Sequence, residues 1–453
     1  MVIKNKWFQA SLVAILTLIL SYTLRPYLVS TYQKGSLILI SGLLFCLFLV
    51  YQEFILERPA PQLLLPGGRK ISLPTVLLSL LLIVLILFIT KSFYSLKTTG
   101  YLNIYEIISL SACYQKFGLV KRGLMPTLVN MVSTSDYKVQ IFSATAIGLL
   151  VFAMGLIALY RSKRFAQDQK LYMIGIFLLA PIGFYSQFKF IAGAYDMALI
   201  GFFFLAMAGN GKPWSLIFDI CGILLHEAYF FLRLPFLLFN IYADLIGLGG
   251  RKKIFLSWNL AQLLLSGMVF LLMSSNLVRP PLADLRQHFF QLYPGLPTPS
   301  EGNFHALDPM TKEVDLSFQM KIMNEYHHSP EFRTYFIPVV FSLIVIILLG
   351  YLFNGLKARE KRIDLAFTLM AFAIPLVLSI VATDVGRWMN FGFIAVLSYY
   401  ILIRPTLFSD GKISWLYLFW LLILIFLLTP LGIFEQPLFS ILLGHYYPTP
   451  QAF

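Results

Sequence analysis

Apolar runs of about 20 residues recur along the whole chain. The sequence is 58% hydrophobic and its mean hydropathy is +0.78. Because about 20 apolar residues in helical conformation cross the hydrocarbon core of a bilayer, each run predicts one membrane-spanning helix. The clear runs are 7–24, 36–55, 72–90, 141–160, 171–187, 194–209, 254–275, 335–355, 364–382, 388–404 and 414–434.

The segment 214–248 is also apolar, but it is too long for one span and is interrupted by four residues. These are His226, Glu227, Arg233 and Pro235. We interpret the segment as two helices, about 214–231 and 234–248, that meet at a turn near the proline. The sequence therefore predicts an all-α polytopic membrane protein with about 13 transmembrane helices, within a range of 11–14.

The distribution of basic residues predicts the orientation of these helices. Lys and Arg are retained in short cytoplasmic loops, so their compact clusters mark the inner side. With a cytoplasmic N-terminus, the clusters at 161–170, 251–253 and 357–362 all lie inside. Treating 214–248 as a single helix would place the last two clusters outside. The split is therefore preferred, and it makes the segment 276–334 extracytoplasmic.

The net charge of +14 and the pI near 9.5 raise the question of nucleic-acid binding. The basic residues lie at membrane boundaries, and no soluble basic domain is present to hold a duplex, so no nucleic-acid partner is expected. Cys46, Cys113 and Cys221 show neither a disulfide pattern nor a metal-ligand spacing. The first apolar run is followed by Arg25 and Pro26 without a small-residue cleavage pattern, which predicts a retained signal-anchor.

Two outer segments depart from the apolar pattern. The large loop 276–334 carries four of the six histidines and seven of the 21 acidic residues. The connector 92–140 has apolar residues at helical spacing, which predicts two short amphipathic helices lying in the membrane interface. Both segments are places to look for chemistry at a membrane surface.

Lys121, Arg122 and Gly123 lie between the two helices expected in this connector. One interpretation is a phosphate clamp, because an arginine binds phosphate oxygens with two parallel donors and a lysine adds a point charge. The other is a pair of cations that extend toward the lipid headgroups. Glu106, on the preceding helix, is a candidate general base or a solvated acid on the helix face.

His226 and Glu227 stand with Arg233 at the outward end of the split segment. Three ionisable groups at membrane depth are costly unless they face one another or a wet cavity, so they form either a substrate site or a pairing cluster that stabilises the turn. The second histidine of an HExxH zinc site is absent. Neither a metal nor a cofactor is expected.

Two further outer turns carry similar residues. Asp384, Arg387 and Trp388 lie in a short connector, where Arg can bind phosphate and Trp can stack on a sugar ring, or where the Asp and Arg pair with each other. Lys189 and Asp196 flank another turn. The catalytic candidates are Glu106, His226, Glu227 and Asp384. The substrate-binding candidates are Lys121, Arg122, Lys189, Asp196, Arg233, Arg387 and Trp388.

This combination resembles bacterial envelope-polysaccharide membrane proteins, namely polymerases of the Wzy type and glycosyltransferases of the GT-C class. The resemblance lies in the overall architecture and in the motifs at 121–123, 226–227 and 384–388. It implies that the outward arginines Arg122, Arg233 and Arg387 hold a pyrophosphate-linked glycan, with Arg279 or Arg286 as an additional member of this set. GT-C enzymes place a catalytic acid in the first outer loop; residues 25–35 contain none, so Glu106 would take that role.

The resemblance implies transfer of a sugar or oligosaccharide from a polyprenyl phosphate or pyrophosphate carrier. The expected partners are the polyprenyl-linked saccharide, membrane lipids and envelope-polysaccharide assembly proteins, and the expected location is the bacterial inner membrane. Two alternatives remain at this point. One is a transporter or flippase for a lipid-linked or small polar substrate, and the other is a transferase similar to an O-antigen ligase.

Overall fold

The structure is a computed structural model of the 453-residue chain. It describes residues 62–64, 70–72, 104–132, 136–161, 195–209, 212–248, 254–294, 307, 310–311, 320–321, 324–325, 327–328, 339–344, 346–347, 358–380 and 385–404. The predicted spans 7–24, 36–55, 171–187 and 414–434 lie outside these residues, as does 72–90 apart from Ser72, and 335–355 is described in part.

The described fold is helical apart from one antiparallel hairpin, in which Leu63 is opposite Ile71. The strands are β1 (Gln62–Leu64) and β2 (Lys70–Ser72). The α-helices are α4 (Ile104–Ser109), α5 (Tyr114–Phe117), α6 (Leu124–Val132), α7 (Tyr137–Arg161), α10 (Asp196–Ala208), α11 (Pro213–Leu225), α12 (Ala228–Leu245), α13 (Ile254–Ser274), α14 (Leu282–Leu292), α17 (Ala358–Leu376) and α18 (Val385–Ser398). Shorter elements are the 3-10 helices η3 (Asn276–Val278) and η6 (Val377–Ile380) and the π-helix η7 (Tyr399–Ile403).

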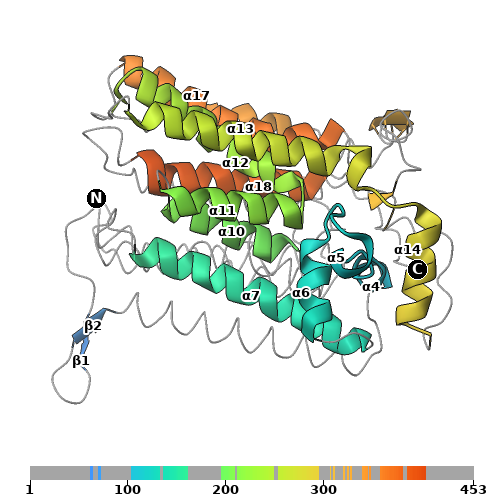
Figure 1. The fold of residues 1–453 in the computed structure, drawn as a ribbon. Coiled ribbons are helices and arrows are strands. Elements are labelled where there is room, and N and C mark those ends of the chain that lie inside the picture. Colours follow the sequence, from blue (N-terminus) through green and yellow to red (C-terminus); the bar gives the residue numbers. More distant parts are fainter. Residues whose placement is uncertain are drawn as a thin grey trace.

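Within the described residues, four helices are long and apolar enough to cross a membrane. They cover Val139–Leu159, Ala228–Leu245, Leu256–Ser274 and Arg359–Ile380. The apolar helices α10 and α11 are shorter, at 13 residues each. These helices run side by side as a bundle (Figure 1). The total of about 13 spans stays a prediction.

The prediction that 214–248 forms two helices is confirmed, but the predicted position of the break was wrong. The chain leaves the helix at His226, whose backbone is extended (φ −163°, ψ 128°), and α12 starts at Ala228. Pro235 lies inside α12. A proline removes one backbone donor from a helix, and here the ladder continues on both sides of that missing bond.

Helices α7 and α10 pack closely because glycines line their contact. A Cβ atom on Gly201 would lie 2.6 Å from the backbone nitrogen of Phe152, and one on Gly155 would lie 2.7 Å from the carbonyl oxygen of Gly201. Small residues let helix backbones approach in a membrane, where packing replaces the hydrophobic effect as the main attraction between helices. The rings of Phe152 and Phe204 pack beside this contact, with centroids 6.1 Å apart.

A buried polar network joins α11, α12 and α13. The Asp219 carboxylate accepts hydrogen bonds from the Tyr229 hydroxyl (2.7 Å), the Arg233 Nε (3.0 Å) and the Gln262 side-chain nitrogen (2.6 Å). Asp219 and Gln262 are fully buried, and Arg233 is 1% exposed. Charges in an apolar interior require such partners, so this network fixes how the three helices meet.

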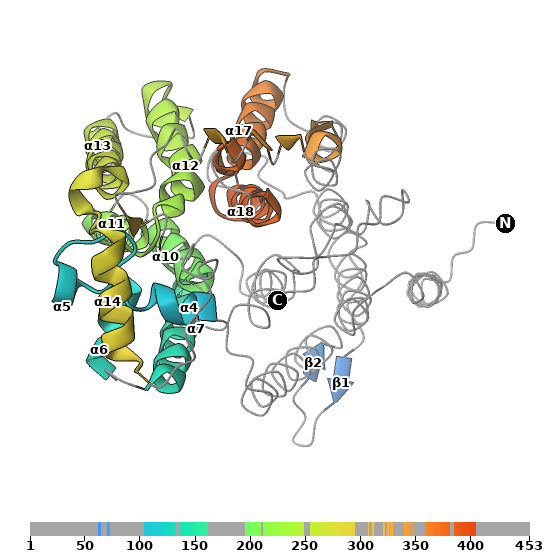
Figure 2. The same ribbon diagram turned by 90° about the vertical axis from the view of Figure 1, so that its right-hand side faces the viewer.

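Short helices lie across one end of the bundle. Figure 2 shows α4, α5, α6 and α14 in front of the ends of the longer helices. The described part of the predicted interfacial connector contains three short helices, α4, α5 and α6, where two were expected. The predicted large loop begins with η3 and α14, and α14 buries Leu285 and Phe289 against the rest of the protein.

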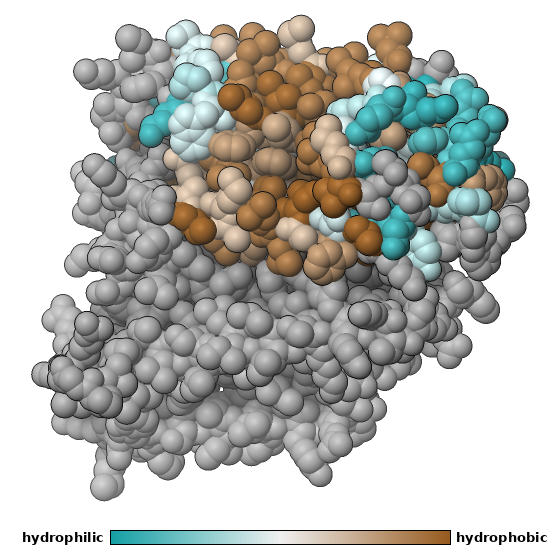
Figure 3. All heavy atoms as spheres, turned by 60° about the horizontal axis from the view of Figure 1, so that its bottom comes forward, coloured by the Kyte–Doolittle hydropathy of each residue, from teal (hydrophilic) through white to brown (hydrophobic). Residues whose placement is uncertain are grey.

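The surface of the described helices separates apolar from polar side chains. Figure 3 shows a broad apolar area over the bundle, between polar side chains at either end. Exposed apolar residues of α13 include Leu264, Met268 and Leu271, which are 59%, 65% and 66% exposed. An apolar surface of this kind is expected where helices face lipid.

Candidate functional site

The loop between α5 and α6 places Lys121 and Arg122 at the end of the bundle. The backbone N–H of Lys121 donates to the carbonyl oxygen of Val278 in η3 (3.2 Å), which ties the loop to the segment after α13. Gly123 has no room for a side chain, because a Cβ atom there would lie 2.3 Å from the Tyr114 ring. The loop is thus fixed from both sides.

Arg122 has a backbone φ of +60°, the one positive value at a non-glycine residue in the described part of the chain. A side chain in this left-handed region costs about 1–3 kcal/mol, and such strain persists only where surrounding contacts impose it. In this loop the imposing contacts are the Lys121 hydrogen bond and the packing of Gly123.

The turn between α11 and α12 presents His226 and Glu227 to the same region. The Tyr229 ring packs against Gly222, where a Cβ atom would lie 2.4 Å from the ring. The hydroxyl of Tyr229 also donates to Asp219 one helix earlier. These contacts hold α12 against α11, so the two residues between the helices have a defined position.

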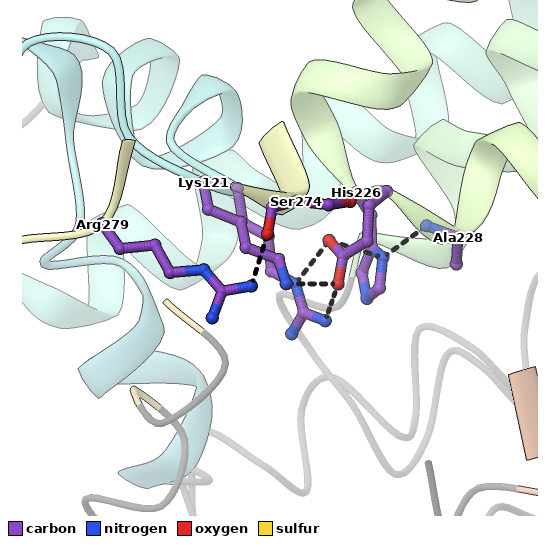
Figure 4. Close-up of polar contacts among 7 residues, drawn as sticks. Lys121, His226, Ala228, Ser274 and Arg279 are labelled. Carbon is purple, nitrogen blue, oxygen red and sulfur yellow. Dashed lines mark hydrogen bonds and ion pairs between the residues drawn. The ribbon is translucent and has the colours of Figure 1, made fainter. Parts of the chain in front are cut away.

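Glu227 is the point at which the two segments meet. Arg122 donates from Nη2 to Oε1 (2.6 Å) and from Nε to Oε2 (3.1 Å), which is a bidentate pair between residues 105 positions apart. The Lys121 Nζ lies 3.1 Å from Oε1 of the same carboxylate. Figure 4 shows Lys121, His226 and Arg279 around this group.

Arg279, directly after η3, adds a third cation. Its Nη2 donates to the carbonyl oxygen of Ser274 at the end of α13 (2.8 Å), and its charge interacts with those of Glu227 and Arg122. We call Lys121, Arg122, Arg279 and Glu227 the cation cluster. It joins the α5–α6 loop, the α11–α12 turn and the segment after α13.

In the cation cluster, burial and neighbouring charges shift the pKa of a residue in opposite directions. Burial alone would raise the pKa of Glu227, but the charges of Arg122 and Lys121 outweigh it and hold this pKa well below its usual range. Burial lowers the pKa of Lys121, and Glu227 offsets part of that effect. The carboxylate is therefore charged, and it is a weak base.

His226 is neutral, and its proton lies on Nε2. The backbone N–H of Ala228 donates to Nδ1 (3.1 Å), so Nδ1 carries a lone pair. The separation of 3.4 Å between Nδ1 and Oε2 of Glu227 then joins two acceptors and is not an ion pair. Burial, followed by the charge of Arg122, places the pKa of His226 well below its usual value.

The start of α18 lies beside this histidine. The Trp388 ring is 6.5 Å from the His226 ring in an edge-to-face arrangement, and the Arg387 guanidinium is 5.9 Å from the Trp388 ring. The Arg387 Nε is also 3.0 Å from Oδ2 of Asp196, at the start of α10. The indole nitrogen of Trp388 is buried and has no hydrogen-bond partner in the part of the chain that the structure describes.

The structure brings together most of the predicted site residues that it describes. Lys121, Arg122 and His226 all lie around Glu227, and Trp388 lies beside His226. Arg387 is paired with Asp196 near the same place. This grouping could not be predicted from one motif, because the residues come from segments more than 100 positions apart.

Arg233 has a different position from the one predicted. It lies inside α12 and pairs with Asp219, so its position is within the bundle and not at the turn. The prediction that it shares the outward end with His226 was wrong because the helix breaks before Ala228. Its partner Asp219, in α11, is not among the candidate residues named from the sequence.

Three predicted residues cannot be placed in the site. Lys189 and Asp384 lie outside the described residues. Glu106 belongs to α4, but its side chain lies outside the described part as well.

Of the loop histidines, His288 lies on α14, with its ring 5.4 Å from that of Phe117. Within the described ranges, no three His, Cys, Asp or Glu residues group as metal ligands would.

The arrangement is suited to binding an anion. An arginine fork and a lysine converge on two carboxylate oxygens, and a phosphate presents oxygens with similar spacing. His226 and Trp388 lie next to this group. Comparison with protein-family models, curated protein sequences and solved structures finds no match for this chain.

Proposed function

We propose that this protein is a membrane glycosyltransferase or polysaccharide polymerase that uses a polyprenyl phosphate or pyrophosphate donor. The observation that carries the proposal is the cation cluster, which gathers Lys121, Arg122 and Arg279 at one end of an apolar helical bundle. A lipid carrier enters from the bilayer, and its phosphate then lies at the depth where the bundle ends.

The chemistry of glycosyl transfer requires cations at this position. The donor's phosphate leaves with a negative charge, and preorganised charges that stabilise the leaving group are commonly the largest contribution to catalysis. The acceptor hydroxyl loses a proton to a general base. Trp388 packs beside His226 and is only 3% exposed, so it supports the edge of the cluster and is not available to stack on a sugar ring.

Glu227 fits a counter-ion better than a base, because its pKa lies well below the usual range. The base is then assigned to Glu106 or Asp384, the remaining acids among the catalytic candidates. Glu106→Gln is expected to abolish turnover while donor binding stays near that of the wild type, since the amide keeps the shape but cannot take a proton. Activity within about twofold of the wild type would remove Glu106 from the reaction and leave Asp384 as the base.

Analysis of lipid-linked glycans in a deletion strain tests the proposed function. A polymerase leaves single repeat units on the carrier when it is absent, and a single-sugar transferase leaves a glycan that lacks one sugar. Re-introduction of the wild-type chain restores the product, and Arg122→Lys does not. Normal glycans at normal length in the deletion strain would refute the proposal.

A transporter is the second candidate, and the pair Asp219–Arg233 favours it. Ionisable residues within membrane helices often belong to a transport pathway. The two side chains pair with each other, and Asp219 also accepts hydrogen bonds from Tyr229 and Gln262, which fits a structural pair as well. The deletion strain separates the two: a flippase leaves normal glycans on the wrong face. A ligase-like transferase leaves full-length polymer on its carrier.

The proposed location is the bacterial inner membrane, with the cation cluster on the extracytoplasmic side. Its support is the positive-inside pattern, in which basic clusters such as 357–362 lie at the other ends of the helices. The proposed partners are the polyprenyl-linked saccharide, membrane lipids and the proteins that assemble envelope polysaccharides.

A further inference from the structure

The carboxylate of Glu227 lies where a phosphate would bind. Two donors of Arg122 and the Nζ of Lys121 all point to its two oxygens, at 2.6, 3.1 and 3.1 Å. A phosphate group held by the same arginine edge needs these same donors. The cation cluster is thus a phosphate-type site that holds an internal anion.

We propose that Glu227 is a specificity-determining residue that competes with incoming anions, so that the substrate phosphate binds by displacing its carboxylate from Arg122. This inference rests on the proposed function, because it concerns the phosphate of the lipid-linked donor. It assigns to Glu227 a role different from that of an acid or base in the reaction.

Displacement is required by the geometry of one guanidinium edge. Nε and Nη2 of Arg122 engage both oxygens of Glu227, so a second anion on that edge would repel the carboxylate at close range. The repulsion is strong because the site is largely buried: the side chains of Lys121 and Glu227 are 8% and 14% exposed. One anion must leave this edge of Arg122 for another to bind it.

The position of Glu227 in the chain allows the side chain to leave without moving the backbone. It lies in the two-residue turn between α11 and α12, and its neighbours are held independently of it. His226 accepts the N–H of Ala228, and Tyr229 packs on Gly222. Glu227 itself has three rotatable side-chain bonds, and its attractive polar contacts within the described residues are with Lys121 and Arg122.

An internal carboxylate makes the site selective. A small monoanion such as acetate gains no more from Arg122 and Lys121 than Glu227 already does, and it also loses translational freedom on binding. A phosphate group with two or more charges gains more from the same cations. Specificity of this kind comes from an element that disfavours the wrong ligand.

The test measures binding of inorganic pyrophosphate and of acetate to the purified full-length protein in zwitterionic lipid nanodiscs, by titration calorimetry. Glu227→Gln keeps the size of the side chain and removes its charge. It is expected to bind pyrophosphate about tenfold more tightly than the wild type, and to bind acetate measurably. Glu360→Gln, a matched change in the first turn of α17, is expected to leave both affinities unchanged.

The opposite result has a clear meaning. Weaker binding of pyrophosphate by Glu227→Gln would show that the carboxylate orients Arg122 for the ligand, and the inference would be overturned. Glu227→Asp decides the matter if the Gln variant does not fold. Its shorter side chain keeps the charge but weakens the contact with Arg122, so tighter pyrophosphate binding is expected and weaker binding would overturn the inference.

The outcomes also separate this inference from the proposed function. If wild type and all variants fail to bind pyrophosphate, the phosphate site itself is wrong and both proposals fall. If the wild type binds pyrophosphate and Arg122→Lys does not, the phosphate site stands. The pyrophosphate affinity of Glu227→Gln then tests only whether Glu227 competes with the ligand.

Discussion

At the scale of single residues, the arginine at 122 combines two uncommon features. Its backbone adopts a left-handed conformation, and its guanidinium binds a carboxylate from a segment 105 residues away. The sequence suggested both a phosphate clamp and a lipid-facing cation for this residue. Its contact with Glu227 favours the first interpretation, because a cation that extends into the headgroups would not be aligned with a buried acid.

Replacing Arg122 with Lys is expected to lower pyrophosphate affinity by about tenfold or more, because an ammonium cannot reproduce the planar two-donor fork. Calorimetric titration of the purified protein measures the change. Arg359→Lys is the control, since Arg359 is exposed at the start of α17, and it is expected to bind as the wild type does. Equal pyrophosphate affinities of the two variants would favour the interpretation that Arg122 extends toward the lipid headgroups.

His226 predicts a dependence of stability on pH. Its pKa in the folded protein lies well below the value of about 6.5 in an unfolded chain. As the pH falls, the unfolded state therefore takes up a proton on His226 before the folded state does. The contribution of His226 to the stability of the folded state is fully present above about pH 6.5 and is lost as the pH falls toward the folded pKa. Between about pH 6.5 and 5, the wild type is expected to lose stability progressively.

His226→Asn removes this titration while keeping an acceptor for the N–H of Ala228. The Tm of both proteins is measured by thermal unfolding between about pH 7.5 and 5, in steps of about one pH unit. The difference in Tm between wild type and variant is expected to shrink or reverse as the pH falls. A difference that is constant over this range would mean that His226 titrates equally in both states.

At the scale of elements, short-range rules predicted the helices well and the helix ends less well. The apolar pattern of 214–248 correctly indicated two helices, but Pro235 suggested a break that the chain makes at His226 and Glu227. The break lies there because the His226 ring accepts the N–H of Ala228, an otherwise unpaired donor of the first turn. No local rule assigns this capping role to a histidine.

The contact between α7 and α10 provides a prediction at this scale. Gly201→Ala places a Cβ atom 2.6 Å from the backbone of Val151 and Phe152, so the helices must separate. The expected cost is about 1–3 kcal/mol in the free energy of unfolding. Thermal unfolding of the purified protein in detergent measures it as a lower Tm.

Gly267→Ala is the matched control in α13. A Cβ atom there meets no atom within 4 Å, and alanine favours a helix over glycine by about 1 kcal/mol. This variant is therefore expected to match or exceed the Tm of the wild type. Equal effects of the two substitutions would mean that α7 and α10 are not in close contact at Gly201.

At the scale of the whole molecule, the direction of the helices gathers the site at one end. The starts of α10, α12 and α18 carry Asp196, Glu227 and Arg387, and the segment after α13 carries Arg279. Helices that alternate in direction bring these ends together although they are distant in sequence. The short helices in front of them complete that end of the bundle (Figure 2).

The proposed topology is tested by labelling cysteines introduced into a cysteine-free background. Gly302→Cys, in the predicted outer loop, is expected to react with a membrane-impermeant thiol reagent in intact cells. Arg359→Cys, at the exposed start of α17, is expected to react only after permeabilisation. The reverse pattern would place the cation cluster on the cytoplasmic side and refute the extracytoplasmic site.

The sequence by itself determined that the chain forms apolar helices long enough to cross a membrane, and which residue types stand at the helix ends. These properties follow from the length and period of apolar runs, which are local in the chain. The tertiary structure alone decided the partners: Arg122 with Glu227, Arg387 with Asp196, and Arg233 with Asp219. The physical reason is that an ion pair depends on how helices far apart in sequence pack together, and no local pattern contains that information.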